Sequence, residues 1–180
     1  MSRSPFPPRS FPTTRMLDLH AADPDVLVLV GTQTGNSEIV ADALAETLGD
    51  LGFAAHLLDM AEAYPEQLAD YRQIVAVLCT WSEGTFPDNA VEFAEALEAV
   101  RPDLSGVRFG VCGLGDHDYD PYYQTAAHRL IDLLTASGAT EVLPLHDIDG
   151  GPSAADIAGA VDWVTRCATA FAAASPPVDS

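Results

Sequence analysis

Residues 32–37 read TQTGNS, and nearly every position in this stretch offers a hydrogen-bond donor. The stretch follows an apolar run, and a helical pattern begins near Asn36, so the free N–H groups of a helix N-terminus add to the hydroxyls of the two threonines and the serine. Such a loop can hold the oxygens of a terminal phosphate without a cation. The alternative is that Asn36 or Ser37 only caps the helix, but a cap needs a single such residue. We therefore expect a phosphate site, with Gly35 allowing close approach of the backbone.

Two aromatic residues stand where other apolar runs end. Trp81 follows the run 74–79 almost directly, and Tyr119 lies in the loop after the run 107–113. Each ring offers a flat face that can stack on a planar heterocycle, although a tryptophan at such a place is more often a packed lid residue. A phosphate loop together with two aromatic faces favours a ligand with a phosphate tail and a flat ring.

Alternating aspartates surround Tyr119, at positions 116, 118 and 120. A calcium loop of the EF-hand type requires glycine at its sixth position and glutamate at its twelfth, where this chain has Pro121 and Ala127. The calcium interpretation therefore fails, and no metal site is expected. We define the acidic rim as Glu83, Asp116, Asp118, Asp120, Asp147 and Asp149, and we interpret it as a solvated border of the site.

These residues need a scaffold that brings distant loops together. Apolar runs at 26–31, 53–58, 74–79, 107–113 and 141–145 read as five strands, and helical patterns follow at 36–48, 88–100, 121–137 and 153–174, with a weaker one at 65–71. Alternation of this kind predicts an α/β fold, a doubly wound parallel sheet with helices on both faces. Ligands of such sheets bind outside the carboxyl ends of the strands, which is where the loops above lie.

Composition narrows the class of protein further. The chain of 180 residues has 27 acidic residues against 8 arginines and no lysine, and its formal net charge is -19. Such a surface disfavours nucleic acid and anionic membranes and would attract a basic protein partner, although acidity can also serve solubility or a high-salt habitat. Three cysteines that match no metal spacing indicate a reducing, cytoplasmic location.

The two ends of the chain differ from its middle. Residues 1–24 are rich in proline, serine and arginine and are expected to form a disordered tail, in which Met16 is a second possible start. Residues 175–180 form a short C-terminal tail by the same criterion. One folded domain is expected over 25–174.

With these motifs in place, the stretch 26–170 resembles a flavodoxin. GTQTGNSE is similar to the phosphate-loop pattern of that family, and CTWSEGTFPDNA and GLGDHDYDPYY resemble its second and third flavin loops. The PDNA ending and the GLGD…Y loop look most like the flavin domains of diflavin reductases, including the NADPH–cytochrome and sulfite reductase types, and like small stand-alone relatives. The resemblance implies a five-stranded sheet in the order 2-1-3-4-5 and flavin mononucleotide (FMN) as cofactor.

The same resemblance assigns residues to the cofactor but no catalytic residue. The phosphate would be held by residues 32–37, the ring would lie between Trp81 and Tyr119, and backbone at 79–82 and 114–116 would contact its edge. Written out, the expected cofactor-binding set is Thr32, Gln33, Thr34, Gly35, Asn36, Ser37, Cys79, Thr80, Trp81, Ser82, Leu114, Gly115, Asp116, His117, Asp118, Tyr119, Tyr122, Tyr123 and Asp147.

One departure from the family pattern concerns Ser82. Related domains commonly carry glycine directly after the aromatic residue, and its peptide group turns over when the flavin gains one electron. A positive φ is costlier for serine than for glycine, so Ser82 is expected to change how readily this happens, while Gly84 could ease the turn.

The function implied is that of a monomeric one-electron carrier with basic-faced redox partners, a flavin reductase as donor and a haem or iron–sulfur enzyme as acceptor. Three alternatives stay open: a quinone reductase that itself oxidises NAD(P)H, a binding module without flavin, and the FMN subunit of a split diflavin reductase. His117 and His128 could titrate near neutral pH, but solvated surface histidines are the simpler interpretation.

Overall fold

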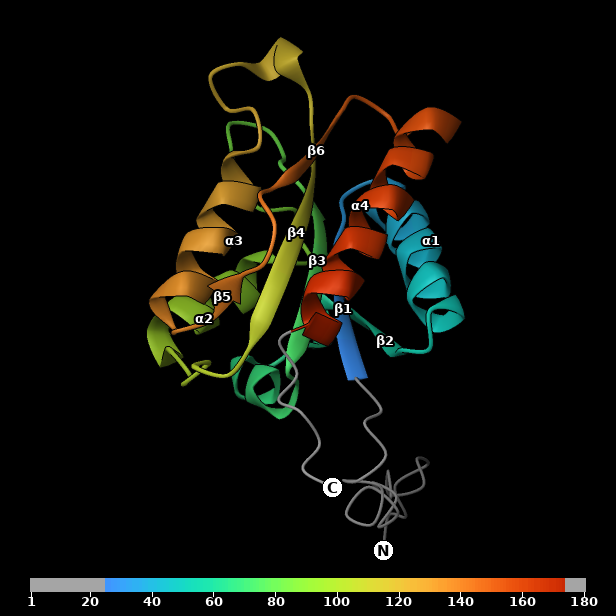
Figure 1. Ribbon diagram of the computed structural model, residues 1–180. Helices are drawn as coiled ribbons and strands as arrows, with labels where there is room; N and C mark the ends of the chain where they lie inside the picture. Colours follow the sequence, from blue (N-terminus) through green and yellow to red (C-terminus); the bar gives the residue numbers. More distant parts are fainter. Residues whose placement is uncertain (1–24, 174–180) are drawn as a thin grey trace, which may run out of the picture.

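The computed structural model describes residues 25–173, and the two predicted tails lie outside them. The elements in chain order are β1 (Asp25–Gly31), α1 (Asn36–Asp50), β2 (Ala54–Asp59), the short 3₁₀ helices η2 (Met60–Glu62) and η3 (Pro65–Asp70), β3 (Gln73–Cys79), α2 (Val91–Val100), β4 (Arg108–Gly115), η4 (His117–Tyr119), α3 (Thr125–Ala136), β5 (Thr140–Glu141), β6 (His146–Asp149) and α4 (Ala154–Ala173). Figure 1 shows a central sheet covered by helices on both faces.

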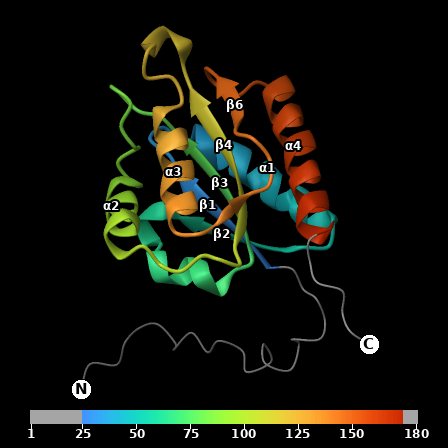
Figure 2. The same cartoon turned by 60° about the vertical axis from the view of Figure 1, so that its left-hand side comes forward.

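All strand pairs of the sheet are parallel, and the strand order is β2-β1-β3-β4-β5, with β6 also paired to β4. This confirms the predicted doubly wound sheet and its order, with β6 as an additional strand. Successive side chains of β1 point to opposite faces of the sheet, and both faces are covered by helices. Val28 packs toward α1 and α4, whereas Leu27 and Leu29 pack toward α2 and α3. The turned view in Figure 2 shows the two helix pairs on opposite sides of the sheet.

The predicted fifth strand at 141–145 is wrong in its bounds. The chain forms two short strands instead, Thr140–Glu141 beside the start of β4 and His146–Asp149 beside its end. The N–H of Val142 still donates to Phe109 O at 2.9 Å, but residues 143–145 leave the ladder, and this interval contains Pro144, which has no N–H to donate to a neighbouring strand. As a result, His146–Asp149, which the sequence assigns to a loop, extends the sheet to the edge of the site.

Two helices begin later than predicted. Helix α2 begins at Val91 rather than at 88, and α3 begins at Thr125 rather than at 121. The N-cap of α2 is Ala90, and no side chain caps the helix, although Asp88 and Asn89 directly precede it in the sequence. The weak helical pattern at 65–71 is the 3₁₀ helix η3. Among residues 25–173, no helix is both long enough and apolar enough to cross a membrane.

Candidate functional site

A cavity of about 420 Å³ opens at the carboxyl edge of the sheet. It falls in the size range of small-molecule and cofactor sites. The residues lining it are Thr32, Thr34, Asn36, Ser37, Cys79, Thr80, Trp81, Ser82, Leu114, Gly115, Asp116, Tyr119, Gly150 and Gly151. They come from the last residues of β3 and β4 and from the segments that follow β1, β3, β4 and β6, so the topology gathers four loops into one pocket, as the sequence predicts.

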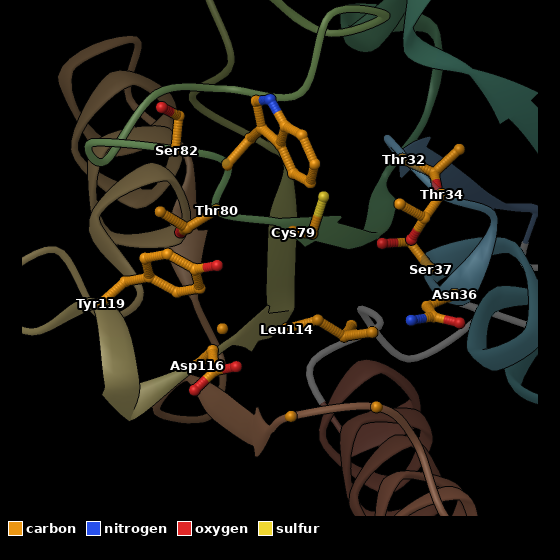
Figure 3. A pocket seen from close by; sticks show the side chains of 14 residues that line it. Thr32, Thr34, Asn36, Ser37, Cys79, Thr80, Ser82, Leu114, Asp116 and Tyr119 are labelled. Carbon is orange, nitrogen blue, oxygen red and sulfur yellow. The ribbon is translucent and has the colours of Figure 1, made fainter.

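The loop after β1 occupies one end of the pocket. Figure 3 shows Thr32, Thr34, Asn36 and Ser37 together at this end, and Tyr119, Thr80 and Ser82 at the other. Gly35 has a φ of 91° and directly precedes α1, so the helix N-terminus begins inside the loop. No side chain caps the helix, and the proposal that Asn36 or Ser37 serves only as its cap is therefore wrong.

Ser37 is the strongest sign that this end of the pocket is built for a ligand. The residue is 0% exposed, and its Oγ has no hydrogen-bond partner. A buried hydroxyl without a partner costs free energy unless something else satisfies it. Its position at the first turn of α1, beside Thr34 and Asn36, fits an oxyanion that would accept this bond.

Cys79 is the last residue of β3, and its side chain lies between the two ends of the pocket. Burial raises the pKa of its thiol, and the nearby backbone of Gln33 and hydroxyl of Ser37 partly oppose this rise, although the geometry gives Ser37 Oγ no hydrogen bond to the thiol. The thiol is therefore neutral at physiological pH and adds no charge to the end of the pocket formed by the loop after β1. Cys112 and Cys167 are fully buried in the core, so Cys79 is the one cysteine of the chain that reaches the pocket.

The aromatic end of the pocket is open to solvent. Trp81 is 42% exposed and Tyr119 is 62% exposed, and both line the cavity. Trp81 is fixed by two backbone hydrogen bonds with Thr85, each of 2.8 Å, which close the loop between them. Exposed rings that face a cavity gain most from a planar partner, which makes stacking a better explanation of Trp81 than the lid alternative.

Ser82 lies within the closed loop and has a φ of 47°. This places a serine in the left-handed region that glycine adopts more easily, and Gly84 nearby has a φ of 85°. The structure thus has a positive φ at this serine, whereas its effect on how readily the peptide turns over stays a prediction.

Several predicted cofactor residues do not line the cavity. The side chain of Gln33 turns away to Asp88, whose N–H donates to Gln33 Oε1 at 2.8 Å. The others outside the lining are Gly35, His117, Asp118, Tyr122, Tyr123 and Asp147. Their assignment to the cofactor stays a prediction.

Part of this second group forms a polar cluster beside the pocket. The ring of His117 stacks on Tyr123 with centroids 3.6 Å apart, and its Nδ1 lies 2.7 Å from Asp149 Oδ2. The hydroxyl of Tyr123 donates to Asp147 Oδ2 at 2.8 Å. Burial, together with Asp147, raises the pKa of Tyr123 to about 12. This cluster joins the loop after β4 to β6, and the lining of the cavity includes residues of that loop and the two residues that follow β6.

Sequence reasoning missed two lining residues, Gly150 and Gly151. They follow β6, and the N–H of Gly150 donates to Gly115 O at 2.7 Å, which continues the β4–β6 pairing to the rim of the cavity. Two consecutive glycines after a strand were a usable signal, because only a small residue lets backbone approach a ligand closely.

The charge around the pocket is negative. All six acidic residues of the acidic rim are at least partly exposed, and Asp116 lines the cavity itself. Among residues 25–173, no group of three His, Cys, Asp or Glu residues is arranged to hold a metal ion. A ligand at this site would therefore be held by dipoles and hydroxyls at one end and by aromatic faces at the other.

Comparison with known proteins identifies relatives of both sequence and fold. Residues 28–163 match the family model described as flavodoxin. The chain is 32% identical over 167 residues to the sulfite reductase [NADPH] flavoprotein alpha-component of Bacillus subtilis, covering 89% of this chain and 27% of that protein. The corresponding protein of Aliivibrio fischeri is 35% identical over 123 residues, 68% of this chain and 20% of its own length. The chain thus spans only about a quarter or a fifth of these curated relatives.

Solved structures agree in fold and in size. A flavodoxin from Pseudomonas aeruginosa, solved as a cysteine-to-serine mutant, superposes with a TM-score of 0.75 and 27% identity, covering 82% of this chain and 99% of that one. Oxidised flavodoxin 1 from Bacillus cereus superposes with a TM-score of 0.74 over 84% of this chain and 99% of its own. At 24% identity the latter likeness concerns the fold alone.

Proposed function

Because the chain belongs to the flavodoxin family, whose fold implies a flavin cofactor, we propose that its pocket binds FMN and that the protein carries single electrons between redox partners. The observation that supports this most directly is the pairing, in one cavity, of a phosphate loop containing the unpartnered Ser37 hydroxyl with the exposed rings of Trp81 and Tyr119. Bound FMN would supply the redox chemistry, and the chain would bind and orient it.

The phosphate group would lie at the N-terminus of α1, between the hydroxyls of Thr34 and Ser37. A helix N-terminus carries about half a positive charge, which replaces the missing lysine or arginine. Trp81 and Tyr119 would hold the ring and exclude water from its faces.

The acidic rim would select the partners. With a net charge of -19 and the rim beside the open end of the pocket, this face attracts proteins with a basic docking surface and orients them toward the flavin. We infer a NAD(P)H-dependent flavin reductase as donor and a haem or iron–sulfur protein as acceptor. The similarity to flavoprotein components of sulfite reductase [NADPH] supports a role in electron transfer.

Three measurements test this proposal. The purified protein, mixed with FMN and then desalted, should retain a yellow chromophore with a flavin spectrum. Reduction of a basic haem protein such as cytochrome c, in the presence of a flavin reductase and NADPH, should become at least about tenfold slower from low salt to about 0.5 M salt, because screening removes the attraction. A protein that stays colourless would contradict FMN binding, and steady NADPH oxidation with quinone in the absence of any reductase would indicate a self-sufficient reductase instead.

A further inference from the structure

Asn89 connects three segments of the fold through its amide group. The Oδ1 atom accepts the backbone N–H of Thr32 at 2.8 Å, and the Nδ2 atom donates to Asp59 Oδ1 at 2.9 Å. The residue precedes α2, whereas Thr32 directly follows β1 and Asp59 ends β2. Asn89 is partly buried and contributes no atom to the lining of the cavity.

Thr32, whose backbone is held by Asn89, also contacts the start of α1. Its Oγ1 accepts the N–H of Gly35 at 2.9 Å, and Gly35 is the residue of positive φ from which α1 starts. A continuous chain of hydrogen bonds therefore runs from Asp59 through Asn89 and Thr32 to Gly35. Side chains in such a chain polarise one another, so the loss of one bond weakens the geometry of the rest.

The hydrogen bonds also define which donors are free. The N–H groups of Thr32 and Gly35 are satisfied within the protein, which leaves the hydroxyls and the remaining N–H groups of the first turn to a ligand. A second contact runs alongside, since Gln33 Nε2 donates to Asp88 Oδ2 at 3.2 Å and Gln33 Oε1 accepts the N–H of Asp88 at 2.8 Å. Residues 88 and 89 thus hold residues 32 and 33 from outside the pocket.

From this geometry we propose that Asn89 is a positioning residue for the phosphate end of the cofactor site, acting through Thr32 on the turn at Gly35. The proposal rests on the proposed function, because the phosphate is that of FMN. An amide suits the position because it accepts from Thr32 and donates to Asp59 with one planar group. Alanine would do neither, and aspartate would place a second carboxylate against Asp59.

The test compares FMN with riboflavin, which has the same ring but no phosphate. In fluorescence titrations, Asn89→Ala should weaken FMN binding at least about tenfold and riboflavin binding at most about twofold. Asn89→Asp should also weaken FMN binding. In the double variant Asn89→Asp with Asp59→Asn, the amide is at position 59 and the carboxylate at position 89, so the hydrogen bond between them can form with donor and acceptor exchanged. This variant should return the FMN affinity to within about threefold of that of the original chain.

Gln67→Ala is the matched control. It removes another amide side chain that accepts a backbone N–H, that of Tyr64 at 2.9 Å, in η3 and outside the cavity lining. This variant should leave the ratio of FMN to riboflavin affinity unchanged. Equal weakening of both ligands by Asn89→Ala, or no recovery in the folded double variant, would overturn the proposal.

Hydrogen exchange separates this proposal from the function on which it rests. If the original chain binds neither flavin, the proposed function fails, and exchange of the Thr32 and Gly35 amides still tests the positioning role. Asn89→Ala should speed exchange at both amides, and at Gly35 only through Thr32. Unchanged exchange at Gly35 in a folded Asn89→Ala variant would refute the positioning role of Asn89. The same exchange measurement tests that role if a variant is obtained in too small an amount for the fluorescence titrations.

Discussion

His117 Nδ1 lies 2.7 Å from Asp149 Oδ2, while the backbone N–H of His117 donates to the other oxygen of the same carboxylate at 3.0 Å. One carboxylate at the end of β6 thus holds both the ring and the backbone of the first residue of η4. Both side chains are more than half exposed, so the pair contributes through geometry more than through charge.

The first prediction concerns pH. The hydrogen bond to Asp149, aided by the charges of Asp149, Asp120 and Asp147, raises the pKa of His117 above its ordinary 6.5, and the same bond lowers the pKa of Asp149 below its ordinary 3.8. The stabilisation is complete only where His117 is charged and Asp149 is ionised, between these two ordinary values. It is lost as pH rises through the raised pKa of His117 or falls through the lowered pKa of Asp149.

His146 provides an internal comparison. It stacks on Trp163 with centroids 5.7 Å apart, and burial lowers its pKa. NMR titration of the ring protons should therefore show His117 titrating above 6.5 and His146 below it. His117→Gln should remove the contribution of this pair to the change in unfolding free energy on the alkaline side, and a His117 resonance that titrates below that of His146 would contradict the assignment.

The second prediction concerns the strained serine. Ser82 has a φ of 47°, and Ser82→Gly should raise the unfolding free energy by up to about 1 kcal/mol in urea denaturation, because glycine adopts this conformation without strain. Glu83→Gly is the control in the same loop. Glu83 is not among the residues of positive φ, so its replacement should give no gain. Equal effects of the two variants would show that φ at Ser82 is not the cause.

The third prediction concerns the core beneath the site. A Cβ at Gly110 would lie 2.9 Å from Trp163 Cζ2 and 3.0 Å from Cys167 Sγ. Gly110→Ala should therefore lower the unfolding free energy by roughly 1–3 kcal/mol, since it overpacks the contact between β4 and α4. Gly106→Ala, where a Cβ meets nothing within 4 Å, should be close to neutral in the same assay.

Much of the fold follows from the order of apolar runs and helical patterns, because a buried parallel strand is recognisable without any contact information. The division of the last strand was not predictable in this way. β5 and β6 are only two and four residues long, and most of the apolar run at 142–145, namely residues 143–145, lies in the segment that leaves the ladder. Short edge segments are decided by tertiary contacts rather than by their own sequence pattern.

In the site, too, some features were predictable from the sequence pattern, whereas others depend on tertiary contacts. The predicted phosphate loop and the two aromatic residues are visible in the sequence, because they follow strands that must end at one edge of the sheet. The roles of Gln33 and Asn89 were not predictable, since each depends on which backbone N–H group of a distant loop faces its side chain. A polar residue just before a helix predicts a cap, and here the amide of Asn89 is used by Thr32 instead.

The fourth prediction concerns the unpartnered hydroxyl of Ser37. Removing a fully buried group that has no partner should leave the unfolding free energy of the flavin-free protein unchanged, or raise it by up to about 1 kcal/mol. If the hydroxyl is reserved for the phosphate, the same Ser37→Ala variant should weaken FMN binding by roughly fivefold or more and leave riboflavin binding unchanged.

Ser137→Ala is the matched control for this prediction. Ser137 Oγ is also buried and unpartnered, but it lies at the C-terminal end of α3, outside the cavity lining. Its removal should have the same small effect on stability and no effect on either ligand. If Ser37→Ala instead lowers stability while the ratio of FMN to riboflavin affinity stays constant, the hydroxyl serves the fold, and the phosphate must be held by other donors of the loop.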